Sequence, residues 1–390
     1  MRILYINDEL ATGDGSNYHA LGIWYNLKKQ LGEENVRAYP TPSDGSGARV
    51  NRRGIGLREA FRFPLQLLRI LRKSYLSRKK SRAIIHKLTK EGFTPTHILC
   101  RTTLFDTTAL YVARHFHAKL ITECNAPMYY EHGVMGKLPL QKAMKSWEKK
   151  MLISSQYIYT VSEVCKNMLV KEYELTDSNF LVIPNGYEPK PGISEEDKAA
   201  IRYSLRTAEH LEDKKVITFV GSLKKWHGID ALCALAEAME QYPEYHFLVI
   251  GDGAEYEMIE NYVLKHHNMT YKGKLSSKDM YAWLYASDLG ILPYHKMENF
   301  YFSPLKLYDT IGAGLPFLGT DQGQIHSLCH ELLDERFLIS DCEPGLMTKK
   351  ILAVTQSEET YRSMQAGIQS IQSRVTWEER VKTLLFALEP

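Results

Sequence analysis

Short apolar segments alternate with amphipathic segments along the chain, and this alternation restricts the possible folds more than any other feature. The apolar segments span residues 2–6, 97–100, 119–122, 156–161, 180–183, 216–220, 246–250, 289–292 and 316–318. Most of them are followed by a turn residue and then by a stretch with apolar residues at helical spacing. This order is typical of parallel sheets with helices on both faces, so we predict an α/β protein with doubly wound sheets.

The length of the chain and one polar segment predict two domains. A chain of 390 residues exceeds what a single hydrophobic core usually supports. Residues 184–198 follow the first set of strands and have the Pro, Gly and Glu content of a linker. We expect a Rossmann-like domain in residues 1–190, a second in 191–375, and a C-terminal helix in 376–390 that packs back toward the first domain. Ligands bind at the carboxyl ends of strands in such sheets, so we expect the two domains to face each other across a cleft.

The sequence shows no signal for export or membrane insertion. No apolar run reaches the ~20 residues that span a bilayer, and no signal-peptide core precedes the first predicted strand. The six cysteines are scattered, without a CxxC pair or zinc-ligand spacing. We therefore expect reduced, mostly buried thiols and a cytoplasmic protein.

The positive charge is concentrated in the first half of the chain. Residues 1–185 carry 28 Lys and Arg against 16 Asp and Glu, and the remainder carries a net negative charge. Residues 62–90 contain ten basic residues and no acidic one, and Phe63, Leu67, Ile70 and Leu71 fall on one helical face. Such a helix can lie on an anionic membrane surface as a peripheral contact. The alternative is a core-packed helix with a solvated basic face. No recognition motif supports nucleic-acid binding.

Glycine turns after predicted strands mark candidate phosphate-binding positions. Gly15 follows the first strand and precedes a helix, and Gly251 follows the strand at 246–250. Glycine lets a backbone approach a phosphate closely, and a helix N-terminus offers free N–H groups and the positive end of its dipole. Neither turn has the GxGxxG fingerprint of a dinucleotide site. Plain turn geometry is the alternative for both.

The turn after residues 216–220 is basic and precedes a helix. It contains Ser222, Lys224, Lys225 and His227. Lysines at this position suit a diphosphate through point charge and helix dipole together, whereas the alternative is a solvated surface turn. Lys274 and Leu275 lie in the loop after the strand that follows 246–250, where backbone groups can hydrogen-bond a base.

Residues 299–316 form the most informative segment. We expect Ser303 to be the N-cap and Pro304 the first residue of a helix whose free N–H groups, including that of Leu305, hold an anion. Asp309 lies under two turns further on, where its carboxylate can accept hydrogen bonds from ribose hydroxyls. The alternative is that Asp309 is a charge on the helix surface.

In this order, the segments resemble family 4 of the retaining glycosyltransferases, which have the two-domain GT-B fold. The resemblance covers essentially the whole chain. It rests on residues 1–6 with the Gly15 loop, 161–163, 182–186, 221–228, 251–253, 286–288 and 303–309. Each motif is weak alone, but the seven follow the order and spacing of the family.

The resemblance implies a nucleotide-sugar site and its residues. The implied donor-binding residues are Gly15, Ser222, His227, Gly251, Lys274, Leu275, Glu298, Ser303, Pro304, Leu305 and Asp309. The implied catalytic residues are Asn125 and Glu123 on the acceptor side, with Lys224 and Lys225 balancing the charge of the leaving diphosphate. The implied reaction retains anomeric configuration and uses no metal, and the sequence has no Asp-x-Asp triplet. The acceptor would be a glycan, a lipid-linked sugar or a small molecule.

Three positions depart from the family pattern. Relatives usually carry Arg at the position of Ser222 and Lys at that of His227, so we expect the phosphate charge to shift to the neighbouring lysines. The Glu-x7-Glu pair appears here as Tyr301 and Asp309, and Glu298 could substitute if its loop bends. Many relatives carry His where Asn125 stands, although Asn followed by a glutamate also occurs in the family.

These departures leave alternatives to the transferase interpretation. A sugar-nucleotide epimerase of the same fold would use a nucleotide sugar without an acceptor. A non-catalytic subunit that binds a sugar nucleotide would tolerate the loss of the first glutamate. A dinucleotide-dependent oxidoreductase is less consistent with the sequence, because neither half contains the glycine fingerprint with its acidic partner.

Overall fold

The computed structural model describes residues 1–11, 15–42, 62–135, 140–190 and 192–389. The chain divides into two compact units. Unit 1 comprises Met1–Pro184 and Arg380–Pro390, and unit 2 comprises Asn185–Glu379. The expected linker at 184–198 therefore contains the passage from unit 1 to unit 2, and the last part of the expected C-terminal helix belongs to unit 1.

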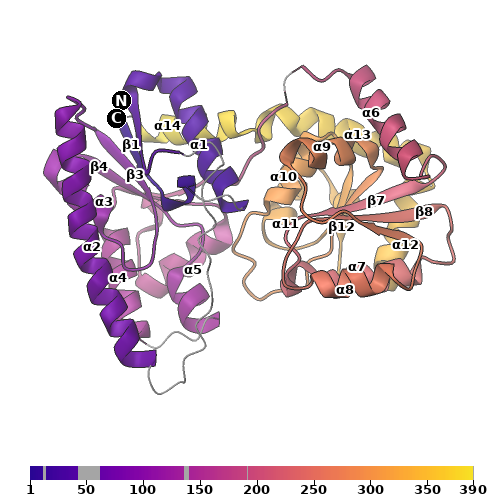
Figure 1. The fold of residues 1–390 in the computed structure, drawn as a ribbon, viewed down its shortest axis with the longest axis horizontal. Helices are drawn as coiled ribbons and strands as arrows, with labels where there is room; N and C mark the ends of the chain where they lie inside the picture. Colours follow the sequence, from indigo (N-terminus) through magenta and orange to yellow (C-terminus); the bar gives the residue numbers. More distant parts are fainter. Residues whose placement is uncertain (12–14, 43–61, 136–139, 191, 390) are drawn as a thin grey trace. The chain divides into compact units, whose positions relative to one another are not determined.

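Unit 1 is built on a six-stranded parallel sheet in the order β2-β1-β3-β4-β5-β6 (Figure 1). The strands are β1 (Ile3–Ile6), β2 (Val36–Tyr39), β3 (His97–Arg101), β4 (Lys119–Glu123), β5 (Tyr157–Thr160) and β6 (Phe180–Val182). The helices are α1 (Gly15–Leu31), α2 (Arg62–Lys90), α3 (Thr108–Phe116), α4 (Gln141–Ile153) and α5 (Glu163–Tyr173). Side chains of α2, α3 and α4 form one core cluster with Leu4, Ile98 and Leu120 of the sheet.

Unit 2 repeats this architecture, with a six-stranded parallel sheet in the order β12-β11-β10-β7-β8-β9. The strands are β7 (Lys215–Val220), β8 (Tyr245–Ile250), β9 (Met269–Tyr271), β10 (Leu289–Leu292), β11 (Phe317–Thr320) and β12 (Leu338–Ile339). The helices are α6 (Glu195–Ala208), α7 (Ile229–Ala238), α8 (Tyr256–Val263), α9 (Ser277–Ala286), α10 (Leu305–Gly312), α11 (Gly323–Leu332), α12 (Pro344–Thr355) and α13 (Glu358–Ile371). Helices α6 and α9 pack together on one face of the sheet, and α7, α8 and α12 lie on the other (Figure 1).

The two sheets confirm the predicted doubly wound α/β fold. The strands are apolar along their length because helices bury both faces, as β8 illustrates with all six residues buried. The strands β2 and β12 were missed in the sequence. β2 is an edge strand with one buried residue, Val36, and β12 has only two residues, so neither produces an apolar run.

The strand order places one switch point in each sheet, where chain connections leave in opposite directions. In unit 1 it lies between β1 and β3, and in unit 2 between β7 and β10. Ligands of open α/β sheets bind at the carboxyl ends of the strands beside such a point. A ligand site is therefore expected among the residues that follow β1, β3, β7 and β10.

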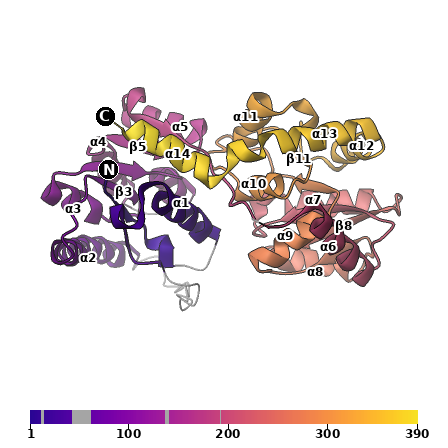
Figure 2. The ribbon, with the colours of Figure 1, turned by 90° about the horizontal axis from the view of Figure 1, so that it is seen from above.

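The last helix, α14 (Trp377–Leu388), starts in unit 2 and ends in unit 1 (Figure 2). The hydroxyl of Thr376 accepts a hydrogen bond from the backbone N–H of Glu379 at 3.2 Å and so caps the start of this helix. All six cysteines are free, and five of them are buried, as expected. Among the described residues, no helix combines the length and the apolar character needed to cross a bilayer.

Candidate active site

Glycine turns interlock at the carboxyl edge of the unit 2 sheet. Gly251 has a φ of +145°, and a Cβ on this residue would stand 1.8 Å from the carbonyl oxygen of Gly221. The N–H of Gly251 donates to the carbonyl of Gly273 at 2.8 Å, and that of Gly221 donates to Ile250 at 2.9 Å. The turns after β7, β8 and β9 therefore pack backbone against backbone. Gly251 is required by this packing, whatever ligand the edge binds.

A buried lysine lies at the switch point of unit 2. Lys306 is 7% exposed, and its Nζ has no hydrogen-bond acceptor. The ammonium group lies 4.0 Å from the ring centre of Phe219 and 4.8 Å from that of Tyr294. A Cβ on Gly221 would stand 3.3 Å from Nζ, so the lysine reaches the turn after β7. Burial lowers the pKa of Lys306 well below its usual range, and the charge of Lys224 lowers it further.

Sequence reasoning missed Lys306, although one signal was present. It is the second residue of α10, where the positive end of the helix dipole disfavours a cation. A buried cation without an acceptor at a helix N-terminus is costly unless an anion binds beside it. The arrangement therefore has the properties of an anion site.

His227 lies beside this lysine as a neutral ring. Its Nδ1 donates to the carbonyl oxygen of Ser222 at 2.5 Å, and its ring packs edge-on against Tyr294. Burial lowers the pKa of His227 to about 2, and the charges of Lys306 and Lys224 contribute to the shift. His227 therefore orients the turn after β7 but supplies no positive charge near neutral pH.

The two lysines expected to balance the phosphate charge are exposed. Lys224 precedes a short 3₁₀ helix (Lys225–His227), and its Nζ lies 5.0 Å from the ring centre of Trp226. Of the two, Lys224 is the one whose charge affects Lys306.

The start of α10 differs from the expectation. The helix begins at Leu305 with Pro304 as its N-cap residue, so Ser303 is not the cap and Pro304 is not the first helical residue. The hydroxyl of Ser303 instead accepts a hydrogen bond from the backbone N–H of Asn185 at 3.1 Å. The Asn185 amide donates to the Ser303 carbonyl at 2.6 Å. These two bonds hold Ser303 outside the helix and tie the start of unit 2 to α10.

Asp309 is not a simple surface charge. Its Oδ1 accepts a hydrogen bond from the hydroxyl of Tyr281 at 3.0 Å, and the ammonium of Lys190 lies over the ring of Tyr281. Burial raises the pKa of Asp309 to about 6, against the lowering effect of Tyr281 and Lys190. The carboxylate is therefore held by one neighbour in a partly buried position of α10.

The other residues that were expected to bind the donor are distributed over several loops. Lys274 is exposed, whereas the side chain of Leu275 packs on the cluster formed by β7, β8 and α9. Glu298 lies on an exposed turn, and Tyr301, which occupies the register position of the missing carboxylate, is buried at 6% exposure. In unit 1, Gly15 is the first residue of α1, as the predicted turn-to-helix position requires.

The acceptor-side residues form a buried polar network at the switch point of unit 1. Strand register puts Arg101 of β3 beside Glu123 of β4, on the same face of the sheet as Tyr5. Glu123 is fully buried and accepts hydrogen bonds from the Tyr5 hydroxyl at 3.1 Å and the Asn125 amide at 2.8 Å. A nitrogen of Arg101 lies 3.6 Å from its carboxylate.

His19 of α1 completes this network and was not singled out in the sequence. Its Nε2 lies 2.7 Å from Glu123 Oε1 and 3.3 Å from the Asn125 amide nitrogen. Burial alone would raise the pKa of Glu123, but the charges and hydrogen bonds of His19, Arg101 and Tyr5 outweigh it and lower the pKa. The Asn125 Oδ1 is buried without a hydrogen-bond donor. Among the described residues of this network, the Asn125 oxygen is thus an acceptor whose capacity is unused.

Comparisons with known families cover most of the chain. The model described as Glycosyltransferase Family 4 matches residues 23–190, and the one described as Glycosyl transferases group 1 matches residues 214–357. The chain belongs to the group 1 glycosyltransferases of the GT-B fold, which confirms the resemblance seen in the sequence.

One curated relative is TuaH of Bacillus subtilis, whose name assigns it provisionally to teichuronic acid biosynthesis as a glycosyltransferase. It is 24% identical over 237 residues, which are 58% of this chain and 56% of the relative. The match thus spans about half the length of that relative.

Solved structures agree on the fold. Anabaena Alr3699/HepE in complex with UDP matches with a TM-score of 0.68 and 14% identity, over 100% of this chain and 99% of that one. Sucrose-phosphate synthase (tll1590) from Thermosynechococcus elongatus matches with a TM-score of 0.67 and 14% identity over 100% of both chains.

Proposed function

We propose that this chain is a glycosyltransferase that uses a nucleotide sugar, with its diphosphate bound at Lys306. The buried ammonium group without an acceptor is the observation that carries the proposal. A diphosphate beside it would supply the missing acceptors and favour the charged form of the lysine. Structural relatives were solved with UDP and with UDP-glucose, which supports a UDP-hexose as the donor.

The proposed chemistry is a metal-independent transfer with retention of configuration. Lys306 and the free N–H groups at the start of α10 would stabilise the diphosphate as it leaves. Lys224 would add charge from the exposed side. Family membership supports retention. Proton NMR of the product anomer formed in the presence of EDTA tests both the retention of configuration and the independence of metal.

The acceptor is proposed to be a sugar hydroxyl that binds to unit 1. The unpaired Asn125 Oδ1 can accept a hydrogen bond from such a hydroxyl, while Glu123 and His19 hold the Asn125 amide in place. The provisional role of the curated relative in teichuronic acid biosynthesis supports a glycan or lipid-linked acceptor.

The first experiment is a thermal-shift panel of UDP, GDP, ADP, their sugar conjugates and NAD, with EDTA present. We expect UDP and one UDP-sugar to raise the melting temperature. A ligand at a hundred times its dissociation constant adds about 2.7 kcal/mol to the free energy of unfolding, which is readily detected. Stabilisation by NAD alone, or by none of these ligands, would contradict the proposal.

Loss of the first carboxylate of the Glu-x7-Glu pair keeps one alternative open. Because Tyr301 is buried at that position, a subunit that binds the nucleotide sugar without turning it over is the second candidate. Incubation with radiolabelled UDP-glucose and a membrane extract distinguishes the candidates. A labelled glycan indicates a transferase, an epimerised nucleotide sugar indicates an epimerase, and binding without any product indicates a non-catalytic subunit.

Donor affinity should fall as the pH is lowered through about 6. Above this value Asp309 is ionised and accepts strong hydrogen bonds from ribose hydroxyls, whereas below it the carboxyl is neutral. We expect the dissociation constant of UDP to rise about fivefold between pH 7.5 and pH 5. Isothermal titration with Asp309→Asn should show weak, pH-independent binding. The exposed Asp279→Asn variant is the control, and an unchanged pH profile in Asp309→Asn would contradict the ribose role.

Peripheral membrane contact through α2 remains part of the proposal, on a different face from the one expected. Ile70 packs on the core of unit 1, while Phe63, Leu67 and Leu71 lie outside the side chains that the structure describes. Helix α2 runs along one side of unit 1 (Figure 1). Its exposed residues include Leu68, Arg72, Tyr75, Lys79 and Arg82, which recur at helical spacing. Two exposed apolar side chains among three cations suit an anionic bilayer on the cytoplasmic face.

Liposome flotation tests this contact. The protein should float with vesicles that contain phosphatidylglycerol and stay behind with neutral vesicles. Leu68→Ser with Tyr75→Ser should abolish flotation, whereas Tyr203→Ser, which changes an equally exposed tyrosine of unit 2, should not. Flotation with neither vesicle would remove the membrane from the proposal.

A further inference from the structure

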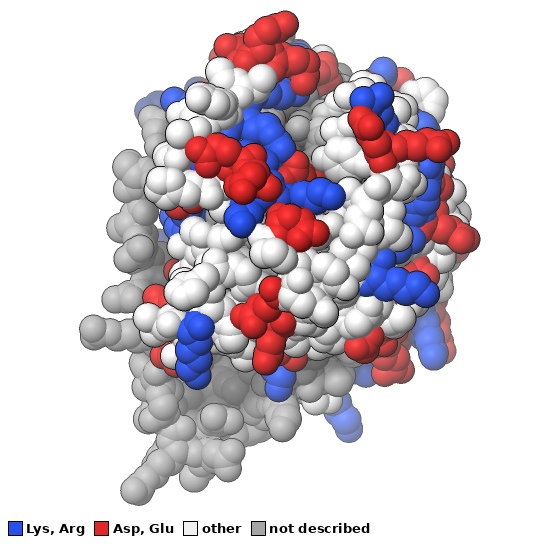
Figure 3. All heavy atoms as spheres, turned by 90° about the vertical axis from the view of Figure 1, so that its right-hand side faces the viewer, with Lys and Arg blue, Asp and Glu red and all other residues white. Residues whose placement is uncertain are grey.

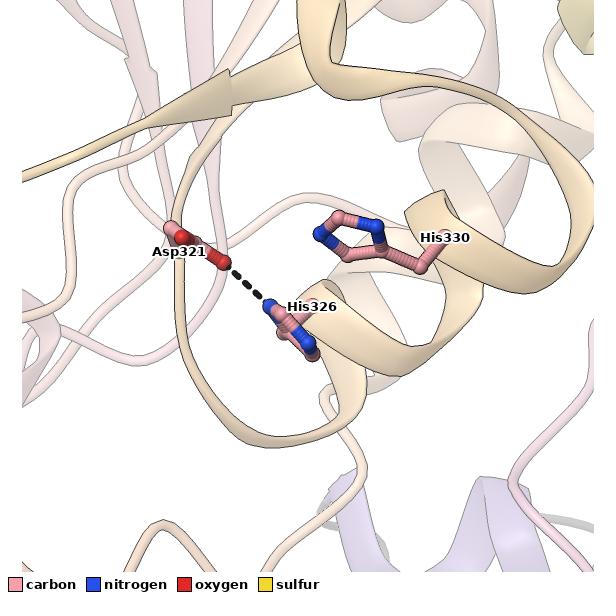
Figure 4. Close-up of side chains that lie close together, drawn as sticks. All are labelled: Asp321, His326 and His330. Atoms are coloured by element: carbon pink, nitrogen blue, oxygen red, sulfur yellow. Dashed lines mark hydrogen bonds and ion pairs between the residues drawn. The ribbon is translucent and has the colours of Figure 1, made fainter.

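Three side chains that no proposed donor or acceptor role uses come together at the end of β11. Asp321 follows the strand directly, and His326 and His330 lie four residues apart on α11, so they share one face of that helix. Figure 4 shows the Asp321 carboxylate pointing at the ring of His326, with the ring of His330 beside it. The His326 and His330 ring centres are 4.2 Å apart.

The geometry of this cluster suits a small cation. One ligand atom from each of the three residues lies within 4.8 Å of the other two. Ligand atoms of a tetrahedral zinc site are about 3.3 Å apart, because each bond is about 2.0–2.1 Å long. Rotation of exposed side chains can close this difference without movement of the backbone. The side chains of Asp321 and His326 are 36% and 51% exposed, so the cation can enter from solvent.

We propose that Asp321, His326 and His330 bind a transition-metal ion of the zinc class. Two imidazoles and one carboxylate form a ligand set that binds borderline metals in preference to calcium or magnesium. Three protein ligands leave a coordination position for water. The ion takes no part in the proposed transfer reaction, and the site stands independently of the proposed function.

The charges around the cluster are mixed. The ammonium of Lys296 donates to the backbone carbonyl of Asp321, so one cation already lies at this turn. Figure 3, in which these residues are not labelled, shows acidic and basic side chains interspersed over one face of the molecule. Affinity must therefore come from direct coordination by the two imidazoles rather than from a field of negative charge, which again favours a borderline metal over a hard one.

The metal site would fix the turn that holds a neighbouring loop. Gln322, next to Asp321, accepts a hydrogen bond from the Met297 N–H at 3.0 Å and donates to the His295 carbonyl at 2.9 Å. Gly323 packs so closely on Phe300 that a Cβ would stand 2.3 Å from its ring. A cation that ties Asp321 to α11 therefore also restrains residues 294–302.

Titration of the 390-residue chain with ZnCl₂, followed by calorimetry, tests the site. We expect one equivalent of Zn²⁺ to bind, and His330→Gln or Asp321→Asn to weaken binding at least tenfold. His267→Gln, which changes an exposed histidine elsewhere in unit 2, is the matched control and should bind like the wild type. Cobalt should give the visible absorption of tetrahedral Co²⁺ in the wild type and not in His330→Gln.

Hydrogen exchange provides the second measurement. Zinc should slow amide exchange in residues 294–302 of the wild type but not of His330→Gln. Absence of zinc binding, or binding that both ligand variants leave unchanged, would overturn the site. Zinc binding without any change in exchange at 294–302 would overturn its restraint of the loop.

Discussion

Replacement of Lys306 with methionine should reduce donor turnover by about 10²–10³-fold, which is the usual effect of removing one group that stabilises a developing negative charge. The same change should leave the protein as stable as the wild type or make it more stable. Methionine has a similar length and removes a buried cation without an acceptor. Steady-state kinetics and denaturant unfolding of one preparation measure both effects.

The stability effect has a defined pH dependence. The pKa of Lys306 is well below its unfolded value of about 10.4, so the unfolded chain binds the proton more readily. The cost of burying this lysine is therefore present at neutral pH and disappears as the pH rises through the unfolded pKa. The advantage of Lys306→Met over the wild type should be larger at pH 7 than at pH 10.

The prediction for Lys306→Met has a matched control variant and a result that would contradict it. Lys349→Met removes an exposed lysine of unit 2, and both its activity and its stability should match the wild type. If Lys306→Met binds UDP as tightly as the wild type, the diphosphate charge is balanced elsewhere. The exposed pair Lys224 and Lys225 would then be the next candidates.

Replacement of Glu123 with glutamine should destabilise unit 1 by about 3 kcal/mol or more. The change preserves shape but leaves the buried Arg101 and His19 without their shared carboxylate. Because the folded-state pKa of Glu123 is lowered, its contribution is complete above the unfolded pKa of about 4.3 and is lost as the pH falls through the folded-state value. The difference between variant and wild type should therefore shrink in acid.

Urea unfolding from pH 7 to pH 3 measures this difference. Glu163→Gln is the matched control in the same unit, because it breaks only the exposed ion pair with Lys166 and should cost less than about 0.5 kcal/mol. A loss below about 1 kcal/mol in Glu123→Gln would show that Glu9, whose carboxylate lies 2.6 Å from Arg101, is sufficient to compensate the buried guanidinium.

The fold was predictable because it depends on patterns that are local in sequence. Buried parallel strands are apolar runs, and the linker between the two sets of strands is polar, so both appear without knowledge of tertiary contacts. The edge strand β2 was missed because only Val36 among its residues is buried. Its pairing with β1 depends on the neighbouring strand and not on its own composition.

The candidate site was predictable in its loops but not in its charges. The turn after β8 was identified from its glycine, and the turn after β7 was identified from its basic residues. Lys306, in contrast, resembles a surface lysine in the sequence. Its burial depends on Phe219 of β7 and on Tyr294, which follows β10, and both are distant from it along the chain or belong to another element. His19 was missed for the same reason, since its partner Glu123 is more than a hundred residues away. Local pattern shows where a ligand can bind, whereas pKa and burial depend on contacts between distant segments.

The path of α14 determines how unit 1, the proposed acceptor-binding half, could be exchanged between relatives. Because unit 1 contains both Met1–Pro184 and Arg380–Pro390, a chimaera with a single junction would combine the sheet of one parent with the closing helix of another. Two junctions, near residues 184 and 380, are needed to transplant the unit intact. In sequence, unit 2, the proposed donor-binding half, is thus an insert, and unit 1, the proposed acceptor-binding half, is the host that surrounds it.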